Sequence, residues 1–212
     1  VPAGLARTAV RVVAMDMDST LITIECIDEI ADLQGIGPAV AAITASAMRG
    51  EIDFRESLTR RVALLAGLPV SALAEVYERR LRLSPGAERM LAGFRAHGAR
   101  TLLVSGGFTY FTDRLKARLG LDATASNTLE VDGGRLTGRL VGEVVDAQGK
   151  ARHLAAMRAQ FATDGGIVVA LGDGANDLPM LAVADVSIAY RAKPAVRAQA
   201  TYALDYSGLH RA

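Results

Sequence analysis

The sequence has only one cysteine, Cys26, and three scattered histidines, so it can build neither a disulfide framework nor a Cys- or His-rich zinc site. Its 24 Lys and Arg nearly balance its 23 Asp and Glu, and no basic block is present. This excludes the electrostatic features of nucleic-acid binding and of attachment to an anionic membrane surface. No apolar run reaches the roughly 18 residues of a membrane span, and no secretory signal is visible. We therefore expect a cytoplasmic protein with no nucleic-acid or membrane partner.

The 212 residues are enough for one medium domain, or for a domain with an inserted lobe. Half of them are hydrophobic, which allows a sizeable core. We expect Cys26 to be a partly buried thiol without chemistry, and His97, His153 and His210 to lie on the surface. The chain opens on Val1 rather than Met, and we expect it to be a fragment of a longer protein.

The stretch VVAMDMDSTL, residues 12–21, organises the rest of the chain. An apolar run of strand length leads into polar residues, a pattern typical of strands whose carboxyl ends carry chemistry. Residues i and i+2 of an extended chain point to the same side, so Asp16 and Asp18 should face one crevice. Two carboxylates so close repel each other, which indicates a metal, a substrate cation or a split acid and base pair. The alternative is a strand that ends in an Asx-type turn.

Helices and strands alternate along the chain with one interruption. After residues 1–11, an expected irregular lead-in, the predicted strands are 12–15, 100–104, 166–171 and 186–189, with a hairpin at 127–145 around Asp132-Gly133-Gly134. The predicted helices are 25–33, 39–49, 53–65 with a capping box of Asp53 and Glu56, 71–81 capped by Ser71, 88–97, 108–119 and 150–161. The alternation predicts an α/β fold with a parallel sheet covered by helices on both faces. The first four helices predict a helical lobe inserted after the first strand.

Two further stretches offer the chemistry of an anion site. Ser105-Gly106-Gly107 lies between a strand and a helix, where free backbone N–H groups and a positive helix end bind anions. An ordinary tight turn would use the same residues. Lys150 begins a predicted helix, an unfavourable place for a cation unless it is aimed at a phosphate over the sheet edge. The alternative is a solvated surface lysine.

The stretch GDGAND places more oxygen ligands after a strand. Asp173, Asn176 and Asp177 follow the predicted strand 166–171, whose carboxyl end should lie near Asp16. Carboxylate oxygens there suit Mg²⁺. The structural alternative is an N-cap in which Asn176 starts the next helix.

These motifs, D-x-D-S-T, S-G-G, a lysine and G-D-G-x-N-D in this order, resemble the haloacid dehalogenase superfamily of phosphohydrolases. The chain is also similar to the phosphoserine phosphatase family of this superfamily, from about residue 12 to residue 194. The stretches that carry this similarity are MDMDSTLITIECIDEIA, AMRGEIDFRESLTRRVALL, SGGFTYF, LTGRLVGEVVDAQGKA and GDGANDLPM. The resemblance implies a Rossmann-like parallel sheet core, residues 1–21 and 84–212, with an inserted helical-bundle cap, residues 22–83. Longer bacterial relatives carry an N-terminal regulatory domain, which we expect this chain to lack, and the resemblance leaves a homodimer open.

The resemblance implies Mg²⁺-dependent hydrolysis of O-phospho-L-serine to L-serine and phosphate through an aspartyl-phosphate, the last step of serine biosynthesis. By the same resemblance the nucleophile is Asp16, the general acid and base is Asp18, and the Mg²⁺ ligands are Asp16, the carbonyl of Asp18 and Asp173. The resemblance makes Ser105, Gly106 and the catalytic Lys150 the phosphate binders, with Gly107 beside them, and it implies that Asn176 contacts the substrate with support from Asp177. It also implies that Glu25 and Arg61 bind the serine ammonium and carboxylate, and that Met48 and Phe54 close over the substrate.

The residues support part of this reading by themselves. Phe54, Leu58, Arg61 and Leu65 share one helical face, and a charge on an apolar stripe needs a partner unless it reaches solvent from the edge. Three other functions stay open. One is a phosphotransferase to an alcohol such as homoserine. Another is a receiver-type signalling domain, against which the length and the inserted helices argue. The third is a silent amino-acid sensor, against which the intact acidic set argues.

Overall fold

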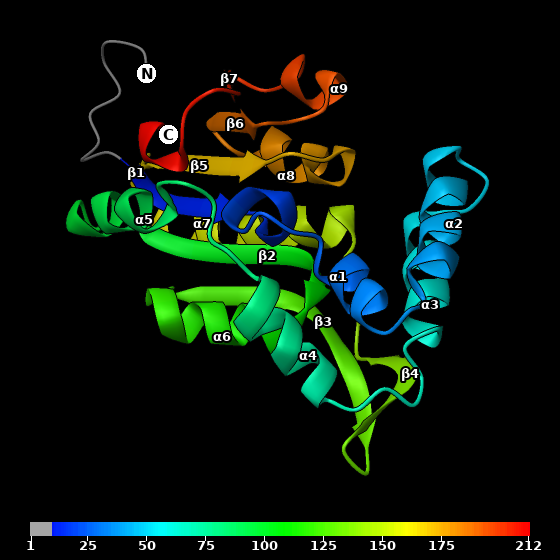
Figure 1. Cartoon of the computed structure of the whole chain (residues 1–212). Coiled ribbons are helices and arrows are strands. Elements are labelled where there is room, and N and C mark those ends of the chain that lie inside the picture. Colours follow the sequence, from blue (N-terminus) through cyan, green and yellow to red (C-terminus); the bar gives the residue numbers. More distant parts are fainter. Residues whose placement is uncertain (1–9) are drawn as a thin grey trace.

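The computed structural model describes residues 10–212, which build a seven-stranded sheet in the order β4-β3-β2-β1-β5-β6-β7 (Figure 1). The strands are β1 Val10–Met15, β2 Arg100–Phe108, β3 Ala123–Asp132, β4 Arg135–Val141, β5 Ile167–Gly172, β6 Val186–Tyr190 and β7 Tyr202–Leu204. Neighbouring strands run parallel except in the β3–β4 hairpin. The predicted α/β fold is therefore confirmed. Of the expected lead-in, residues 1–9 lie outside the described residues, and residues 10 and 11 belong to β1.

The helices fill the connections between these strands. They are α1 Cys26–Leu33, α2 Gly37–Met48, α3 Phe54–Ala63, α4 Ser71–Glu75, α5 Ala87–Ala96, α6 Thr109–Leu119, α7 Ala147–Phe161, α8 Leu178–Val183 and α9 Pro194–Arg197, with single turns at Met17–Leu21, Val76–Arg80, Ala175–Asp177 and Leu209–Arg211. Within residues 10–212, none of these helices combines the length and the apolar character that a bilayer crossing requires.

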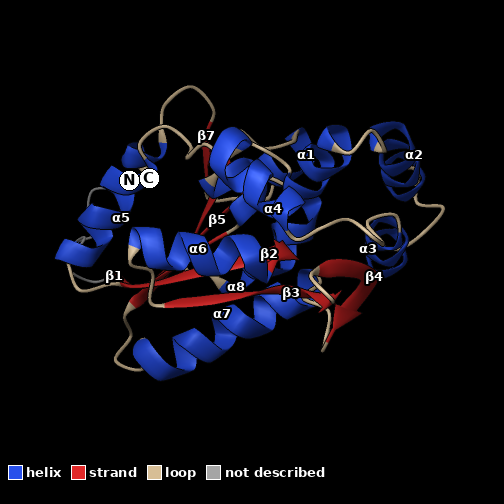
Figure 2. Ribbon diagram, turned by 60° about the horizontal axis from the view of Figure 1, so that its bottom comes forward, coloured by secondary structure: helices blue, strands red, loops and turns tan. Residues whose placement is uncertain are grey.

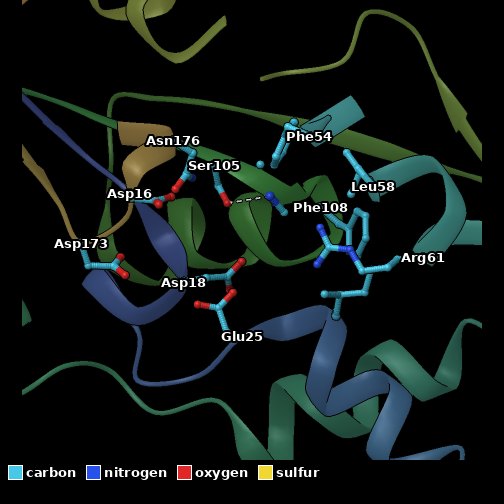
Figure 3. Close-up of a pocket in the computed structure, with 13 residues that line it drawn as sticks. Asp16, Asp18, Glu25, Phe54, Leu58, Arg61, Ser105, Phe108, Asp173 and Asn176 are labelled. Atoms are coloured by element: carbon cyan, nitrogen blue, oxygen red, sulfur yellow. Dashed lines mark hydrogen bonds between the residues drawn. The ribbon is translucent and has the colours of Figure 1, made fainter. Parts of the chain in front are cut away.

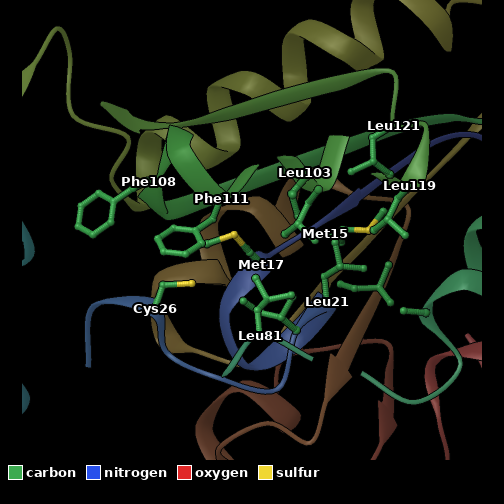
Figure 4. Close-up of a cluster of buried hydrophobic side chains, with 14 of the residues drawn as sticks. Met15, Met17, Leu21, Cys26, Leu81, Leu103, Phe108, Phe111, Leu119 and Leu121 are labelled. Carbon is green, nitrogen blue, oxygen red and sulfur yellow. The ribbon is translucent and has the colours of Figure 1, made fainter. Parts of the chain in front are cut away.

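Helices cover both faces of the sheet (Figure 2). Strand β1 is buried on both faces, as a strand at the centre of a parallel sheet should be. Alternate residues Val13 and Met15 join the hydrophobic cluster that includes α5 and α6, whereas Val12 and Ala14 join the cluster that includes α7 and α8. Figure 4 shows the first cluster around Met15. Burying one large apolar side chain contributes about 1.5–3 kcal/mol, so this centre gives the loops at the strand ends a rigid base.

Residues 22–83 leave the sheet and return to it at one place. Ile22 pairs with Leu83 in an antiparallel bridge, so both ends of the segment lie side by side. The other side of the segment is tied to the hairpin, because Gly67 N–H donates to the Leu136 carbonyl and Leu136 N–H donates to the Leu68 carbonyl, both at 2.8 Å. No strand of the sheet falls within this segment, in agreement with the predicted helical insertion. Its boundaries as a separate cap stay a prediction.

Several predicted element ends are wrong, for local reasons. Helix α7 begins at Ala147, because the side chain of Asp146 caps it by accepting from Gly149 N–H at 2.8 Å. Lys150 therefore lies in the first turn and does not begin the helix. Ser71 is the first residue of α4 and not its cap, and the chain widens into a π-type turn at residues 76–80. Strand β7, only three residues long, was not predicted.

Candidate active site

A pocket opens where the carboxyl ends of β1, β2 and β5 meet helices α1 and α3 (Figure 3). It is lined by Asp16, Asp18, Glu25, Ile27, Phe54, Leu58, Arg61, Ser105, Gly106, Gly107, Phe108, Asp173 and Asn176. Ten of these thirteen are among the site residues expected from the sequence. Ile27 and Phe108 were not predicted, and Leu58 was predicted only as part of the apolar face of its helix. The pocket therefore joins residues from distant parts of the chain at one sheet edge.

The turn after β1 directs the two aspartates of the D-x-D motif. Asp16 N–H donates to the Leu171 carbonyl at 3.0 Å, and the Asp16 side chain accepts from Met17 N–H at 2.7 Å. The chain then turns sharply at Ser19, whose φ of 54° is in the left-handed region that few non-glycine residues adopt. The Ser19 hydroxyl donates to Glu25 at 2.7 Å. These bonds and the left-handed residue fix the conformation of the loop, which is more elaborate than the simple Asx turn that the sequence also allowed.

Asp18 lies in the pocket with one oxygen held by the start of α1. Cys26 N–H donates to Asp18 Oδ1 at 3.2 Å. Burial, assisted by the charge of Glu25 and opposed by the hydrogen bonds from Cys26, raises the pKa of Asp18 from 3.8 to about 7. A carboxyl group with this pKa can both give and take a proton near neutral pH.

The raised pKa of Asp18 predicts how the stability of the metal-free protein depends on pH. Folding penalises the charged carboxylate, so the stability present below about pH 4 should be lost as pH rises through about 7. Asp18→Asn should therefore raise the unfolding temperature at pH 8 and change it little at pH 4. The gain at pH 8 should be on the order of 2 kcal/mol once partial exposure is allowed for.

Thermal unfolding in a chelator, at pH 4 and pH 8, measures this difference. Asp132→Asn, at the exposed end of β3, is the matched control, and as a surface substitution it should change the unfolding temperature little at either pH. A shift of equal size at both pH values for Asp18→Asn would contradict the prediction.

Lys150 is buried between two carboxylates. Its Nζ lies 2.7 Å from Asp16 Oδ2 and 2.7 Å from Asp177 Oδ1. Burial works against the charge of Lys150, but the two carboxylates outweigh it and raise its pKa. The pKa of Asp16 is also raised, first by burial and then by the charge of Asp177, with Lys150 acting in the opposite direction. The alternative of a solvated surface lysine is therefore wrong.

Asp177 holds Lys150 in place through its own hydrogen bonds to the backbone. Its Oδ1 accepts from Lys150, and its Oδ2 accepts from the N–H groups of Asp173 and Gly174, both at 3.0 Å. A Cβ on Gly172 would lie 2.5 Å from the Asp177 carboxylate, so only glycine fits there. Asn176 lines the pocket (Figure 3) and is not the cap of α8, which corrects the N-cap alternative.

The acidic residues at the strand ends can hold a divalent cation. One oxygen from each of Asp16, Asp173 and Asp177 lies within 4.8 Å of the others. Burial, opposed by a hydrogen bond from Thr20 at 2.8 Å, raises the pKa of Asp173 to about 6. A divalent cation would relieve the cost of ionising such a cluster, and its oxygen donors suit Mg²⁺. Asp16 and Asp173 line the pocket whereas the fully buried Asp177 does not, so Asp16 and Asp173 are the better ligands.

The Ser105-Gly106-Gly107 segment forms the adjoining wall of the pocket. Gly107 N–H donates to Ser105 Oγ at 2.8 Å. A Cβ on Gly106 would lie 2.9 Å from the Phe54 ring, and one on Gly107 would lie 2.8 Å from Met17 Cε. A side chain at either position would have to displace the end of the Phe54 or Met17 side chain, so glycine lets the backbone approach a ligand closely.

Arg61 reaches into the pocket on the side away from Asp16 and Asp173 (Figure 3). Within residues 10–212 it forms no ion pair, and its one hydrogen bond runs from Nε to the Ser57 carbonyl at 3.4 Å. Burial lowers the pKa of Arg61, although the charges of Asp28 and Glu25 oppose this. The guanidinium fork is therefore available to a ligand.

Met48 and Cys26 were also singled out from the sequence. Met48, the last residue of α2, is 71% exposed and does not line the pocket, and its expected role over the substrate stays a prediction. Cys26 is fully buried and not partly buried, because it starts α1 against the hydrophobic core. The three histidines are exposed, as expected.

Comparison with known proteins agrees with this geometry. The model of the haloacid dehalogenase-like hydrolase family matches residues 13–182. The chain is 52% identical over 206 residues to a phosphoserine phosphatase of Polaromonas sp. (strain JS666), covering 95% of this chain and 87% of the relative. It is 49% identical over 195 residues to one of Haemophilus influenzae, covering 92% and 62%.

Solved structures show the same relationship. A probable phosphoserine phosphatase from Vibrio cholerae in its unliganded form matches with a TM-score of 0.86 and 48% identity, over 97% of this chain and 63% of that one. A substrate-bound phosphoserine phosphatase complex matches with a TM-score of 0.86 and 35% identity, over 95% and 96%. The chain therefore belongs to the haloacid dehalogenase-like hydrolase family. Within that family, the relatives compared here are phosphoserine phosphatases, and the resemblance read from the motifs is confirmed.

Proposed function

We propose that the chain is a Mg²⁺-dependent phosphatase that hydrolyses O-phospho-L-serine to L-serine and phosphate, as the last step of serine biosynthesis. One observation carries the proposal. A single pocket has Asp16, Ser105 and Asp173 at one end. Elsewhere on its wall are Glu25 and Arg61, which forms no ion pair within residues 10–212. The first end suits a phosphate group, and the two charges suit an amino acid's ammonium and carboxylate. The cytoplasm as its compartment and a homodimer stay predictions.

The acidic cluster fits the metal that this function needs. Asp16, the backbone carbonyl of Asp18 and Asp173 would hold Mg²⁺. When bound, the ion would reduce the repulsion between the phosphate and the carboxylates and stabilise charge on the phosphoryl oxygens.

Asp16 is the proposed nucleophile of the first step. Its carboxylate attacks phosphorus, so that an aspartyl-phosphate bond forms while the bond from phosphorus to the serine oxygen breaks. Asp18 donates its proton to the departing serine oxygen. Lys150, held 2.7 Å from Asp16, offsets the negative charge that gathers there, and Ser105 and Gly106 orient the phosphate with Gly107 beside them.

The second step reverses the proton transfer. A water molecule attacks phosphorus, Asp18 takes its proton, and the bond from phosphorus to Asp16 breaks to release phosphate. We further propose that residues 22–83 act as a cap that excludes bulk water, with Phe54 against the bound substrate. Asn176 contacts the substrate, while Asp177 supports Lys150.

A screen of small phosphomonoesters with and without Mg²⁺ tests the function. Phosphoserine with Mg²⁺ should release serine and phosphate in equal amounts, and a chelator should stop the reaction. Adding homoserine should not reduce the phosphate released. Transfer of the phosphate to homoserine would instead identify a phosphotransferase, and no release from any ester would contradict the proposal.

Asp18→Asn tests the proton-transfer role. The variant should keep its affinity for Mg²⁺, because the proposed ligand at this position is a backbone carbonyl. Its turnover of phosphoserine should fall on the order of 10²-fold or more, the usual scale for general acid and base catalysis. Titration with Mg²⁺ and steady-state kinetics separate the two effects. If metal affinity collapsed while turnover at saturating metal survived, Asp18 would be a ligand and not the acid.

A further inference from the structure

Strand β2 contains two extra residues at the Ser105-Gly106-Gly107 segment. Val104 pairs with Ala125 and Phe108 pairs with Asn127, so β2 advances four residues while β3 advances two. Backbone groups in this bulge cannot all be satisfied by strand pairing, and a buried carbonyl without a donor is costly. The Gly106 carbonyl therefore needs a partner from elsewhere.

Asn127 supplies that partner and also holds a second segment. This side chain is 2% exposed, its Nδ2 donates to the Gly106 carbonyl at 2.8 Å, and its Oδ1 accepts from Val145 N–H at 2.8 Å. The amide orientation is fixed, because a carbonyl needs the NH₂ group and an N–H needs the oxygen. Val145 directly precedes Asp146, the cap of the helix that carries Lys150. One amide group thus joins the Ser105-Gly106-Gly107 segment to the start of α7, the helix that carries Lys150.

The contact with Gly106 also orients the Ser105 hydroxyl. The Gly106 carbonyl and the Gly107 N–H belong to one planar peptide group, so fixing the first fixes the second. That N–H donates to Ser105 Oγ at 2.8 Å. Because Ser105 Oγ accepts this bond, its own proton remains available to an anion in the pocket.

We propose that Asn127 is a positioning residue for phosphate binding, which sets Ser105 and Gly106 in register with Lys150. The inference rests on the proposed function, because its readout is phosphoserine hydrolysis. Asparagine suits this position because it combines a donor and an acceptor at this length. Aspartate would keep the acceptor for Val145 but place a second oxygen against the Gly106 carbonyl.

Steady-state kinetics with phosphoserine, and inhibition by inorganic phosphate, test the proposal on Asn127→Ala and Asn127→Asp. Both variants should raise KM and the inhibition constant of phosphate on the order of 10-fold or more, the scale expected when reacting groups are misplaced by less than 1 Å. The matched control is Thr112→Val. Thr112 is fully buried, and within residues 10–212 its side chain forms one hydrogen bond, at 2.7 Å to Ser126, the neighbour of Asn127. The control should leave both constants unchanged.

A double-mutant cycle identifies the route of the effect. In a Ser105→Ala background, Asn127→Asp should cost much less than it does alone, because both changes remove the same hydroxyl contact. Unchanged constants in a folded Asn127 variant, or fully additive losses, would overturn the proposal. Failure of both Asn127 variants to fold, judged by circular dichroism, would assign the residue to the fold and overturn it as well. Failure of the unmodified protein to hydrolyse phosphoserine would instead count against the proposed function.

Discussion

Asp16→Asn is expected to abolish phosphate release while the protein stays folded. The variant keeps the shape of the side chain and can still accept from Met17 N–H. Lys150 keeps its second partner, Asp177, at 2.7 Å. The amide cannot attack phosphorus, so turnover should fall on the order of 10⁴-fold or more, as when an enzyme loses its nucleophile.

Acid-quenched protein after a short reaction with labelled phosphoserine should carry covalent phosphate in the unmodified chain and none in Asp16→Asn. Asp173→Asn is the informative comparison, because it removes a proposed metal ligand that is not the nucleophile. Excess Mg²⁺ should restore part of the activity of Asp173→Asn and none of that of Asp16→Asn. Labelled Asp16→Asn protein would assign the nucleophile to another residue.

Asp16 was predictable because it belongs to a local pattern. An apolar strand followed by alternate aspartates places both carboxylates at one strand end whatever the rest of the chain does. The same holds for the parallel strands, whose alternation with helices is a property of consecutive residues. The strands could therefore be predicted without knowing that β1 is buried on both faces.

Lys150 was found for a partly wrong reason. The sequence suggested a cation at a helix start, but Asp146 caps a helix that begins at Ala147, three residues before Lys150, and Lys150 is buried in its first turn. Its two carboxylate partners, Asp16 and Asp177, come from the turns that follow β1 and β5. That contact is tertiary, so no local pattern reports it. The cap itself, an aspartate before Ala147, was a signal that could have corrected the boundary.

Asn127 and Met48 show the limits of local patterns in opposite ways. Asn127 sits in a predicted hairpin without any motif of its own, and its role emerges only when β2 bulges beside it. Met48 was expected over the substrate by resemblance alone. It lies exposed at the end of α2, and that role stays a prediction. A resemblance transfers residue types to positions, and no local pattern tells where a side chain on a surface helix points.

Substrate choice should depend on Arg61, because every phosphomonoester presents the same group to Asp16 and Ser105. Phosphoethanolamine lacks only the carboxylate of phosphoserine, so discrimination between them measures the group that binds it. The half-buried Arg61 has no ion-pair partner within residues 10–212, and its planar fork matches a carboxylate. A substrate that leaves this charge unpaired should be rejected.

Arg61→Ala should therefore lower kcat/KM for phosphoserine on the order of 10²-fold and change the value for phosphoethanolamine far less. Arg61→Lys should lie between, because it keeps the charge and loses the bidentate geometry. Arg60→Ala is the matched control, since Arg60 is the preceding residue on the same helix and pairs with Glu56 at 2.5 Å on the exposed side. It should leave both esters unaffected. An unchanged ratio of the two kcat/KM values in Arg61→Ala would make Arg61 a structural arginine, and the phosphoserine preference would have to come from Glu25 or from the shape of the pocket.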